Sequence, residues 1–411
     1  MDIPGLPARR AALRLLDAVL RRGETLDQAA HNAVQGLAAD ADKALARAIA
    51  AEALRWLPDL DALIDSATRE PLPDDAKPRA VLRLMLAQWL RLGTPPHAVV
   101  ATALPLLAGG PKRLAHGVFA SLTRRNASLP AHPGLSATVA ARWGDRAAPI
   151  AAALGEPPRL DLTLRDAGAT AQWAERLGGH SLLPGHLRLP RGEAVGQLPG
   201  FAEGAWWVQD LAASLPARLL GAPQGAGEAL DLCAAPGGKA MQLAAAGWRV
   251  TAVDASAKRL ERLSANFARC GLTAEVVTAD LREWEPDRRF DAILLDAPCT
   301  ATGTCRRHPD VLYRITPRQI AEMAELQQGL LARAAGWLAP GGRLVYAVCS
   351  LEREEGEAVA GGLGLPVDPI RADELPAGLA PGPQGWLRTD PGMLAEAGGL
   401  DGFFIARWRA Q

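Results

Sequence analysis

Two cysteines follow apolar segments and could act together as thiols in one reaction. The run Leu294–Cys299 ends in Asp-Ala-Pro-Cys, which contains Asp296, and the run Val345–Ser350 contains Cys349. A thiolate is a strong nucleophile, and a nearby acid can donate or accept a proton. If both runs are neighbouring parallel strands, their carboxyl ends meet at one edge of a sheet. We therefore expect both thiols and Asp296 to lie in one cleft.

The remaining cysteines carry less chemical information. The chain has five cysteines, Cys233, Cys270, Cys299, Cys305 and Cys349, and none of them forms a Cys-x-x-Cys pair. A zinc site or a disulfide framework therefore has little support, and we expect no metal. A single buried cysteine is usually an inert small hydrophobic residue, which is our interpretation of Cys270 and Cys305.

A glycine-rich segment follows another expected strand and indicates a cofactor loop. It runs from Asp231 to Lys239, and we expect it to bind a cofactor through Cys233, Ala234, Ala235, Pro236, Gly237, Gly238 and Lys239. Backbone can approach a ligand closely where glycine removes the side chain. A Walker A loop is excluded because Ala240 follows the lysine, and the glycine spacing differs from Gly-x-Gly-x-x-Gly. A plain glycine turn remains the alternative.

Two acids at the ends of the following expected strands support a nucleotide-type cofactor. Asp254 could accept hydrogen bonds from ribose hydroxyls, and Asp280 from an adenine amino group. A solvated acid at a strand end is the simpler reading of Asp280 alone. Together with the glycine loop, however, both acids fall where ligands bind in such sheets.

The elements that must position these residues alternate between short apolar runs and amphipathic helices. This alternation predicts an α/β domain of the Rossmann-like kind, with a mostly parallel sheet and an antiparallel edge strand at 402–408. The expected parallel strands are 229–233, 249–254, 275–278, 290–296 and 343–348. The expected helices are 239–246, 257–270 and 317–338.

The first part of the chain has a different pattern. From Ala8 to about Asn126, apolar residues recur at helical spacing and predict an all-α domain of six or so helices. Between them and the sheet we expect a helical piece at 135–154 and a strand at 160–164. The predicted domains are therefore 1–130 (helical), 131–204 (a linker and a small α+β module) and 205–411 (catalytic).

Composition limits the class of protein without identifying a partner. The chain has 411 residues, with 45 Lys and Arg against 45 Asp and Glu, so its net charge offers no argument for a polyanion. Apolar stretches fall short of the ~20 residues of a membrane span, and no secretory signal is evident. We expect a cytoplasmic protein, monomeric by default, without a membrane partner.

These motifs together resemble a known enzyme family. The sequence is similar to the RsmB (Sun/Fmu) family of bacterial 16S ribosomal RNA cytosine-carbon-5 methyltransferases, and its helical start resembles the NusB-like RNA-binding domain of that family. The blocks that carry the resemblance are 231–239, 296–307, 345–350, 198–204 with 208–210, 306–310, 401–404, 8–29 and 113–125.

The resemblance implies S-adenosylmethionine as cofactor and 5-methylcytosine in small-subunit ribosomal RNA as product. It implies that Cys349 attacks carbon 6 of the base and that Cys299 assists release of the enzyme. Asp296 would hydrogen-bond the ring edge and border the cofactor, and Lys239 would close the cofactor motif, with a solvated helix-start lysine as its alternative. The same reaction on transfer RNA or another ribosomal site, and a noncatalytic RNA-binding assembly factor, remain the competing hypotheses.

RNA contacts are expected just past Cys299. Arg306, Arg307 and His308 could hold phosphates flanking the target base, although solvated surface charge is the alternative. Trp206 and Trp207 could stack on bases, but an apolar pair of this kind favours a core position. The chain departs from the family pattern at Cys305, where an aliphatic residue is expected, and at Thr300, where serine is usual.

Overall fold

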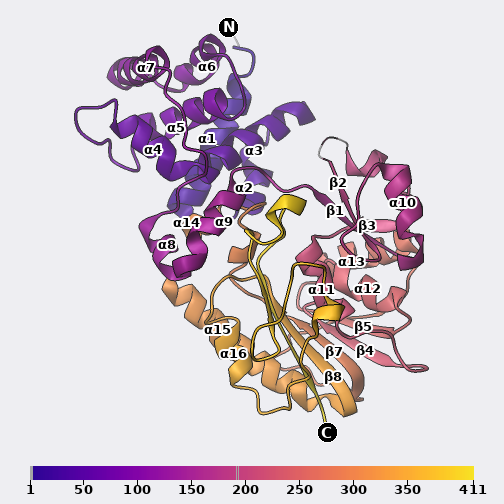
Figure 1. The fold of residues 1–411 in the computed structure, drawn as a ribbon. Coiled ribbons are helices and arrows are strands. Elements are labelled where there is room, and N and C mark those ends of the chain that lie inside the picture. The colour runs from indigo at the N-terminus through magenta and orange to yellow at the C-terminus, as the bar shows by residue number, and fades with distance from the viewer. Residues whose placement is uncertain (1–2, 191, 193) are drawn as a thin grey trace. The chain divides into compact units, whose positions relative to one another are not determined.

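The computed structural model describes residues 3–190, 192 and 194–411, and the chain divides into two compact units (Figure 1). Unit 1 comprises residues 1–157 together with 305–315, and unit 2 comprises 158–304 together with 316–411. The chain thus leaves unit 2 soon after Cys299 and returns to it at Thr316. None of the described helices combines the length and apolar character needed to cross a membrane.

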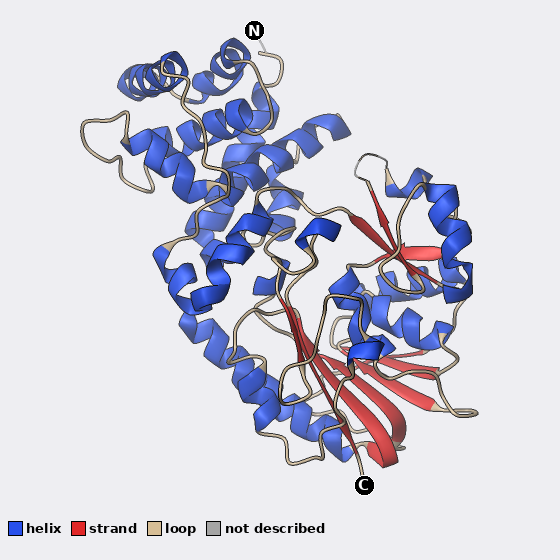
Figure 2. Cartoon of the chain, viewed as in Figure 1, coloured by secondary structure: helices blue, strands red, loops and turns tan. Residues whose placement is uncertain are grey.

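Unit 1 is helical, as the sequence pattern predicts (Figure 2). Its helices are α1 (Leu6–Arg22), α2 (Leu26–Ala33), α3 (Asp40–Arg55), α4 (Leu57–Asp65), α5 (Lys77–Leu90), α6 (Pro96–Ala103), α7 (Gly109–Arg124), α8 (Ala137–Trp143), α9 (Ala147–Leu154) and α14 (Val311–Arg314). The expected helical piece at 135–154 is interrupted at Gly144, whose positive φ of 54° ends α8. Apolar faces of α1, α3, α5 and α7 form one buried core.

Residues 305–315 are anchored within unit 1 by buried polar contacts. The guanidinium of Arg55, 2% exposed, donates to the carbonyl of Arg306 at 3.0 Å, and the Tyr313 hydroxyl donates to the carbonyl of Leu54 at 2.8 Å. Arg142 also donates to the carbonyl of Ile315 at 3.2 Å. Buried backbone carbonyls need such donors, so these bonds fix the segment on the helices.

Unit 2 contains two sheets with their helices. Its strands are β1 (Leu160–Leu164), β2 (His186–Leu189), β3 (Trp206–Val208), β4 (Glu228–Leu232), β5 (Arg249–Asp254), β6 (Glu275–Thr278), β7 (Phe290–Asp296), β8 (Leu338–Val348), β9 (Leu387–Thr389) and β10 (Phe403–Arg409). Its helices are α10 (Thr170–Leu177), α11 (Leu211–Arg218), α12 (Gly238–Ala245), α13 (Ala257–Cys270), α15 (Pro317–Gly336) and α16 (Glu357–Gly361).

The larger sheet has the order β6-β5-β4-β7-β8-β10-β9. Strands β4 to β8 pair in parallel, and β10 runs antiparallel to β8. The predicted mostly parallel sheet is confirmed, but the predicted edge strand is one place inside the edge, because β9 pairs beyond it. Helices α11, α12 and α13 cover one face, and α15 and α16 cover the other (Figure 1).

The smaller sheet, β2-β1-β3, is antiparallel, and a buried carboxylate on β1 links it to α11. The guanidinium of Arg188 donates twice to the carboxylate of Asp161, at 2.6 Å for each bond. The same carboxylate accepts from the backbone of Leu211 at 3.0 Å, at the start of α11. Trp206 and Trp207 on β3 are 0% and 3% exposed, so both are core residues rather than a stacking surface.

Candidate active site

The two thiols that the sequence singles out lie in contact. Cys299 follows β7 and Cys349 follows β8, and their Sγ atoms are 3.4 Å apart. Both side chains are partly buried. The pairing of the strands explains the contact, because β7 and β8 are parallel neighbours with Asp296 beside Ala347.

Backbone hydrogen bonds then hold the two loops in register beyond the strands. The amide of Ala297 donates to the carbonyl of Ala347 at 3.0 Å, and the amide of Gly303 donates to the carbonyl of Cys349 at 3.0 Å. The loop from 297 to 304 therefore runs along the segment that carries Cys349. Its path leaves little freedom for the two sulfurs to separate.

The surroundings of Cys299 oppose its ionisation. The hydrogen bond with Cys349 raises the pKa of Cys299 well above its usual value, and burial and the negative charges of Cys349 and Glu355 act in the same direction. Cys299 therefore keeps its proton. Cys233 is no competing nucleophile, because burial raises its pKa to about 12.

The glycine segment forms a tight loop between β4 and α12. Cys233 and Gly237 have positive φ values of 61° and 106°. At Gly237 a side chain would be strained, and its Cβ would lie 3.0 Å from Leu263. The amides of Ala234 and Ala235 donate inside the protein, to the carbonyl of Val253 and the carboxylate of Asp254, so β5 holds the loop.

The structure gives the two predicted cofactor acids different surroundings. Asp254 is buried, and its oxygens accept from the amides of Ala235 at 3.2 Å and Ser256 at 2.9 Å, so it shapes the loop directly. Asp280 follows the edge strand β6 and is paired with Arg282, whose hydrogen bonds lower its pKa to about 2. Its predicted contact with a cofactor stays a prediction.

Asp231, at the start of the glycine segment, is a residue that the sequence argument did not place in the site. It is fully buried, and neither carboxylate oxygen has a hydrogen-bond partner among the described residues. Burial raises its pKa well above the usual value, as do the charges of Asp296 and Asp254, whereas Lys239 lowers it. A buried, unpartnered carboxyl is costly and points to a missing ligand.

Lys239 and Asp296 form the polar wall beside the thiols. The ammonium of Lys239 donates to the carboxylate of Asp296 at 2.7 Å and lies 5.4 Å from the ring centre of Phe403. Burial lowers the pKa of Lys239, but Asp296, Cys349 and Asp231 together raise it above its usual value. The lysine thus stays protonated, with its charge close to Cys349.

The residues predicted to contact RNA lie in unit 1 and are mostly covered. Arg306 is 4% exposed, and Arg307 is partly buried. His308 faces Asp27, with 3.7 Å between nitrogen and oxygen, and burial lowers its pKa, so it is neutral at pH 7. A neutral imidazole is a poor phosphate ligand, and the contacts of all three residues stay predictions.

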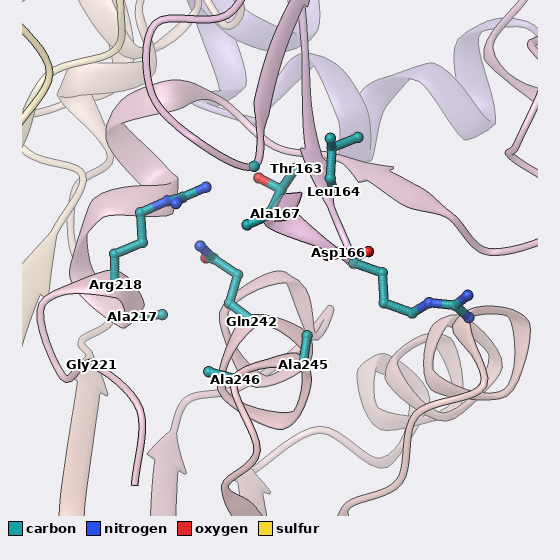
Figure 3. A pocket seen from close by; sticks show the side chains of 12 residues that line it. Thr163, Leu164, Asp166, Ala167, Ala217, Arg218, Gly221, Gln242, Ala245 and Ala246 are labelled. Atoms are coloured by element: carbon teal, nitrogen blue, oxygen red, sulfur yellow. The ribbon is translucent and has the colours of Figure 1, made fainter. Parts of the chain in front are cut away.

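A hollow of about 540 Å³ in unit 2 is separate from this site (Figure 3). Figure 3 shows Arg218 and Gln242 extending into it, and Ala245 and Ala246 line it at the C-terminal end of α12. The glycine segment 231–239 reaches the opposite, N-terminal end of that helix. Burial lowers the pKa of Arg218 to about 10.

Comparison with known proteins identifies the family. The model of the 16S rRNA methyltransferase RsmB/F family matches residues 218–409, and that of the NusB family matches residues 6–108. Ribosomal RNA small subunit methyltransferase B of Klebsiella pneumoniae is 35% identical, covering 97% of both chains. The chain belongs to the 16S rRNA methyltransferase RsmB/F family. The protein of the same name from Xanthomonas campestris is 36% identical over 86% of each chain.

Solved structures agree with this methyltransferase fold. The crystal structure of PH0851 covers 100% of both chains with a TM-score of 0.71 at 21% identity, which shows the shared fold. A methyltransferase homolog protein from Pyrococcus horikoshii is 27% identical with a TM-score of 0.56, covering 68% of this chain and 96% of that one. The sequence resemblance to this family is therefore confirmed.

Proposed function

We propose that this methyltransferase forms 5-methylcytosine in small-subunit (16S) ribosomal RNA, with Cys349 as nucleophile and Cys299 as the group that assists release. The observation that carries the proposal is the 3.4 Å contact between the two sulfur atoms beside Lys239 and Asp296. The relatives named as small-subunit ribosomal RNA methyltransferases support the choice of substrate.

The cofactor is S-adenosylmethionine, which supplies the methyl group when bound. The described carboxylates suit its positive charges: Asp231 is buried without a partner, and Lys239 is the cation that faces Asp231 and Asp296. A cationic ligand beside Asp231 would favour its ionised form, which burial and the neighbouring carboxylates oppose. The backbone of the loop from Cys233 to Gly238 would line the same site, with Asp254 holding its shape.

Covalent activation of the base follows from the position and charge of Cys349. Its thiolate adds to carbon 6 of cytosine, and the electron pair of the carbon 5 to carbon 6 bond moves so that carbon 5 becomes nucleophilic. One oxygen of Asp296 would hydrogen-bond the edge of the cytosine ring, while the other accepts from the ammonium of Lys239. Lys239 is the cation whose charge interacts with Cys349.

Release requires a base for the proton on carbon 5, and the thiol pair explains how Cys299 could become one. The Cys349 sulfur is the largest cause of the raised pKa of Cys299. Once that sulfur is bonded to carbon 6, it no longer carries charge, so Cys299 loses its proton to solvent more readily. Its thiolate then accepts the carbon 5 proton, the double bond reforms, and Cys349 leaves.

Unit 1 would deliver the RNA to this site. Its match to the NusB family supports an RNA-binding role for the helices. The target base must leave its stack to reach the sulfurs, so a loop or an unfolded segment is a better substrate than a duplex. We expect the protein to act in the cytoplasm.

The proposal is tested by methylation of 16S ribosomal RNA taken from a strain that lacks the gene. Purified protein and labelled S-adenosylmethionine should produce 5-methylcytosine at one position by bisulfite sequencing, and Cys349→Ala should abolish it. If total RNA of that strain is offered instead, label found only in transfer RNA would overturn the proposed substrate. Absence of S-adenosylmethionine binding in a calorimetric titration would favour a noncatalytic assembly factor.

A further inference from the structure

A buried carboxylate joins the two loops that carry the cysteines. Glu355 is 0% exposed and lies just before α16. Within the described chain its oxygens accept four hydrogen bonds: from the Thr300 amide at 2.9 Å, the Thr300 hydroxyl, the Ser350 hydroxyl at 2.7 Å and the Gln327 side-chain amide at 2.9 Å. An ionised carboxylate has about four acceptor positions, so its capacity is filled.

The placement of these donors gives the carboxylate a specific role. Thr300 directly follows Cys299, and Ser350 directly follows Cys349. The Glu355 side chain therefore binds both Thr300 and Ser350, the residues that follow the two cysteines. A second bond reinforces the link, because the Leu351 amide donates to the Thr302 hydroxyl at 2.9 Å.

Glu355 is itself fixed to the rigid part of unit 2. The Tyr346 hydroxyl on β8 donates to the backbone carbonyl of Glu355 at 2.6 Å. Gln327 on α15 donates both to the Glu355 carboxylate and to the carbonyl of Pro298, at 2.8 Å for the second bond. Strand, helix and both loops thus meet at one buried group.

We propose that Glu355 is a positioning residue that sets the spacing and orientation of the Cys299 and Cys349 sulfur atoms. This inference rests on the proposed two-cysteine function. Glu355 is sealed from solvent and hydrogen-bonds neither sulfur among the described contacts, so it is no acid or base for the substrate. A carboxylate accepts all four bonds, whereas the amide nitrogen of glutamine accepts none and could serve the two hydroxyls only if each of them turned to accept.

The direct test is Glu355→Gln, with Glu354→Gln as its matched control. Glu354 is the preceding residue and is exposed, so its substitution should change nothing. For Glu355→Gln we expect kcat for RNA methylation to fall about tenfold or more, while KM for RNA and Kd for S-adenosylmethionine change less than about twofold. Thr300→Val removes one of the four bonds and should lower kcat by a smaller factor.

A second readout needs neither RNA nor cofactor. Phenylarsine oxide condenses with two thiols held close together, forming two arsenic–sulfur bonds and releasing water. The wild-type protein should bind it through the Cys299 and Cys349 pair, and Cys299→Ala should not. Glu355→Gln should bind it about tenfold more weakly, since two lost hydrogen bonds free the loops.

The outcomes separate this inference from the proposed function. Wild-type arsenical affinity and wild-type kcat in Glu355→Gln would overturn it. A fall in melting temperature and in S-adenosylmethionine binding, with normal arsenical affinity in both Glu355→Gln and Thr300→Val, would show a purely structural role and also overturn it. If arsenical binding changes as expected but the wild type methylates no RNA, the proposed function fails and the positioning role stands.

Discussion

Substitution of Gly303 by alanine should separate the two cysteine loops. A Cβ atom at this position would lie 1.9 Å from the carbonyl oxygen of Gly402 and 3.0 Å from that of Cys349. Both obstacles are backbone atoms, so no side-chain rotation can relieve the contact. Because real Cβ atoms keep at least 3.0 Å from such neighbours, the backbone must move by about 1.1 Å.

The displacement acts on stability and on catalysis. Gly303 donates to the carbonyl of Cys349 at 3.0 Å and accepts from the amide of Gly402 at 2.9 Å. Losing two such bonds costs roughly 2 kcal/mol of unfolding free energy. A misplacement of about 1 Å in an active site can cost about 100-fold in rate, so we expect that loss in kcat.

The same substitution at Gly329 is the matched control. Gly329 lies within α15, is exposed, and a Cβ there would meet nothing within 4 Å. Alanine should stabilise that helix by roughly 0.5–1 kcal/mol and leave methylation unchanged. Urea denaturation should show a lower unfolding free energy for Gly303→Ala and a higher one for Gly329→Ala. Single-turnover methylation should be slower only in Gly303→Ala. Wild-type stability and rate in Gly303→Ala would refute the close packing of the loops.

Three further predictions follow from buried ionisable groups. Asp161→Asn leaves Arg188 buried without its counterion and should destabilise the protein by roughly 3–5 kcal/mol in urea denaturation at pH 7. Burial raises the pKa of Asp161, but the hydrogen bonds from Arg188 and the nearby imidazole of His186 outweigh burial and lower that pKa. The difference in stability should therefore shrink as pH falls below about 4, and a pH-independent difference would contradict this prediction. Asp231→Asn removes a carboxyl whose raised pKa means that its ionisation opposes folding as pH rises. Without cofactor, the variant should therefore have a higher melting temperature than the wild type at pH 8. It should also bind S-adenosylmethionine about tenfold more weakly by calorimetry, and unchanged affinity would exclude Asp231 from the cofactor site. Cys349→Ala removes the hydrogen bond that raises the pKa of Cys299, so that pKa should fall. The pH midpoint of Cys299 alkylation by iodoacetamide measures it. A midpoint that stays or rises would show that Cys349 does not raise the pKa of Cys299.

Much of the larger sheet could be predicted because buried parallel strands are short apolar runs between glycine, proline and acidic residues. The predicted strands at 249–254 and 290–296, which are mostly buried, have the observed bounds, as does the exposed edge strand at 275–278. The strand predicted at 343–348 begins earlier, at Leu338, across Gly341 and Gly342. Strand β9 was not predicted, because three residues give no measurable alternation and their pairing depends on β10.

The two cysteines proposed to react could be located because they follow strand ends, whereas the groups that support them could not. Cys299 and Cys349 follow from strand order alone. Glu355 lies in an acidic run that looks like a solvated surface, and only the tertiary fold shows that it is buried. The placement of residues 305–315 in unit 1 is likewise a long-range property, since Arg55 and Tyr313 hold it through distant backbone carbonyls.

The residue that bonds to the RNA distinguishes the two cysteines, because Cys349 is proposed to bond to carbon 6 while Cys299 serves release. This residue is identified most directly by mass-spectrometric peptide mapping of protein trapped on 16S ribosomal RNA that contains 5-fluorocytosine, in the presence of S-adenosylmethionine. We expect a link to Cys349, no link in Cys349→Ala, and a stable adduct on unmodified RNA in Cys299→Ala. A link to Cys299 that survives in Cys349→Ala would show that the two roles are reversed.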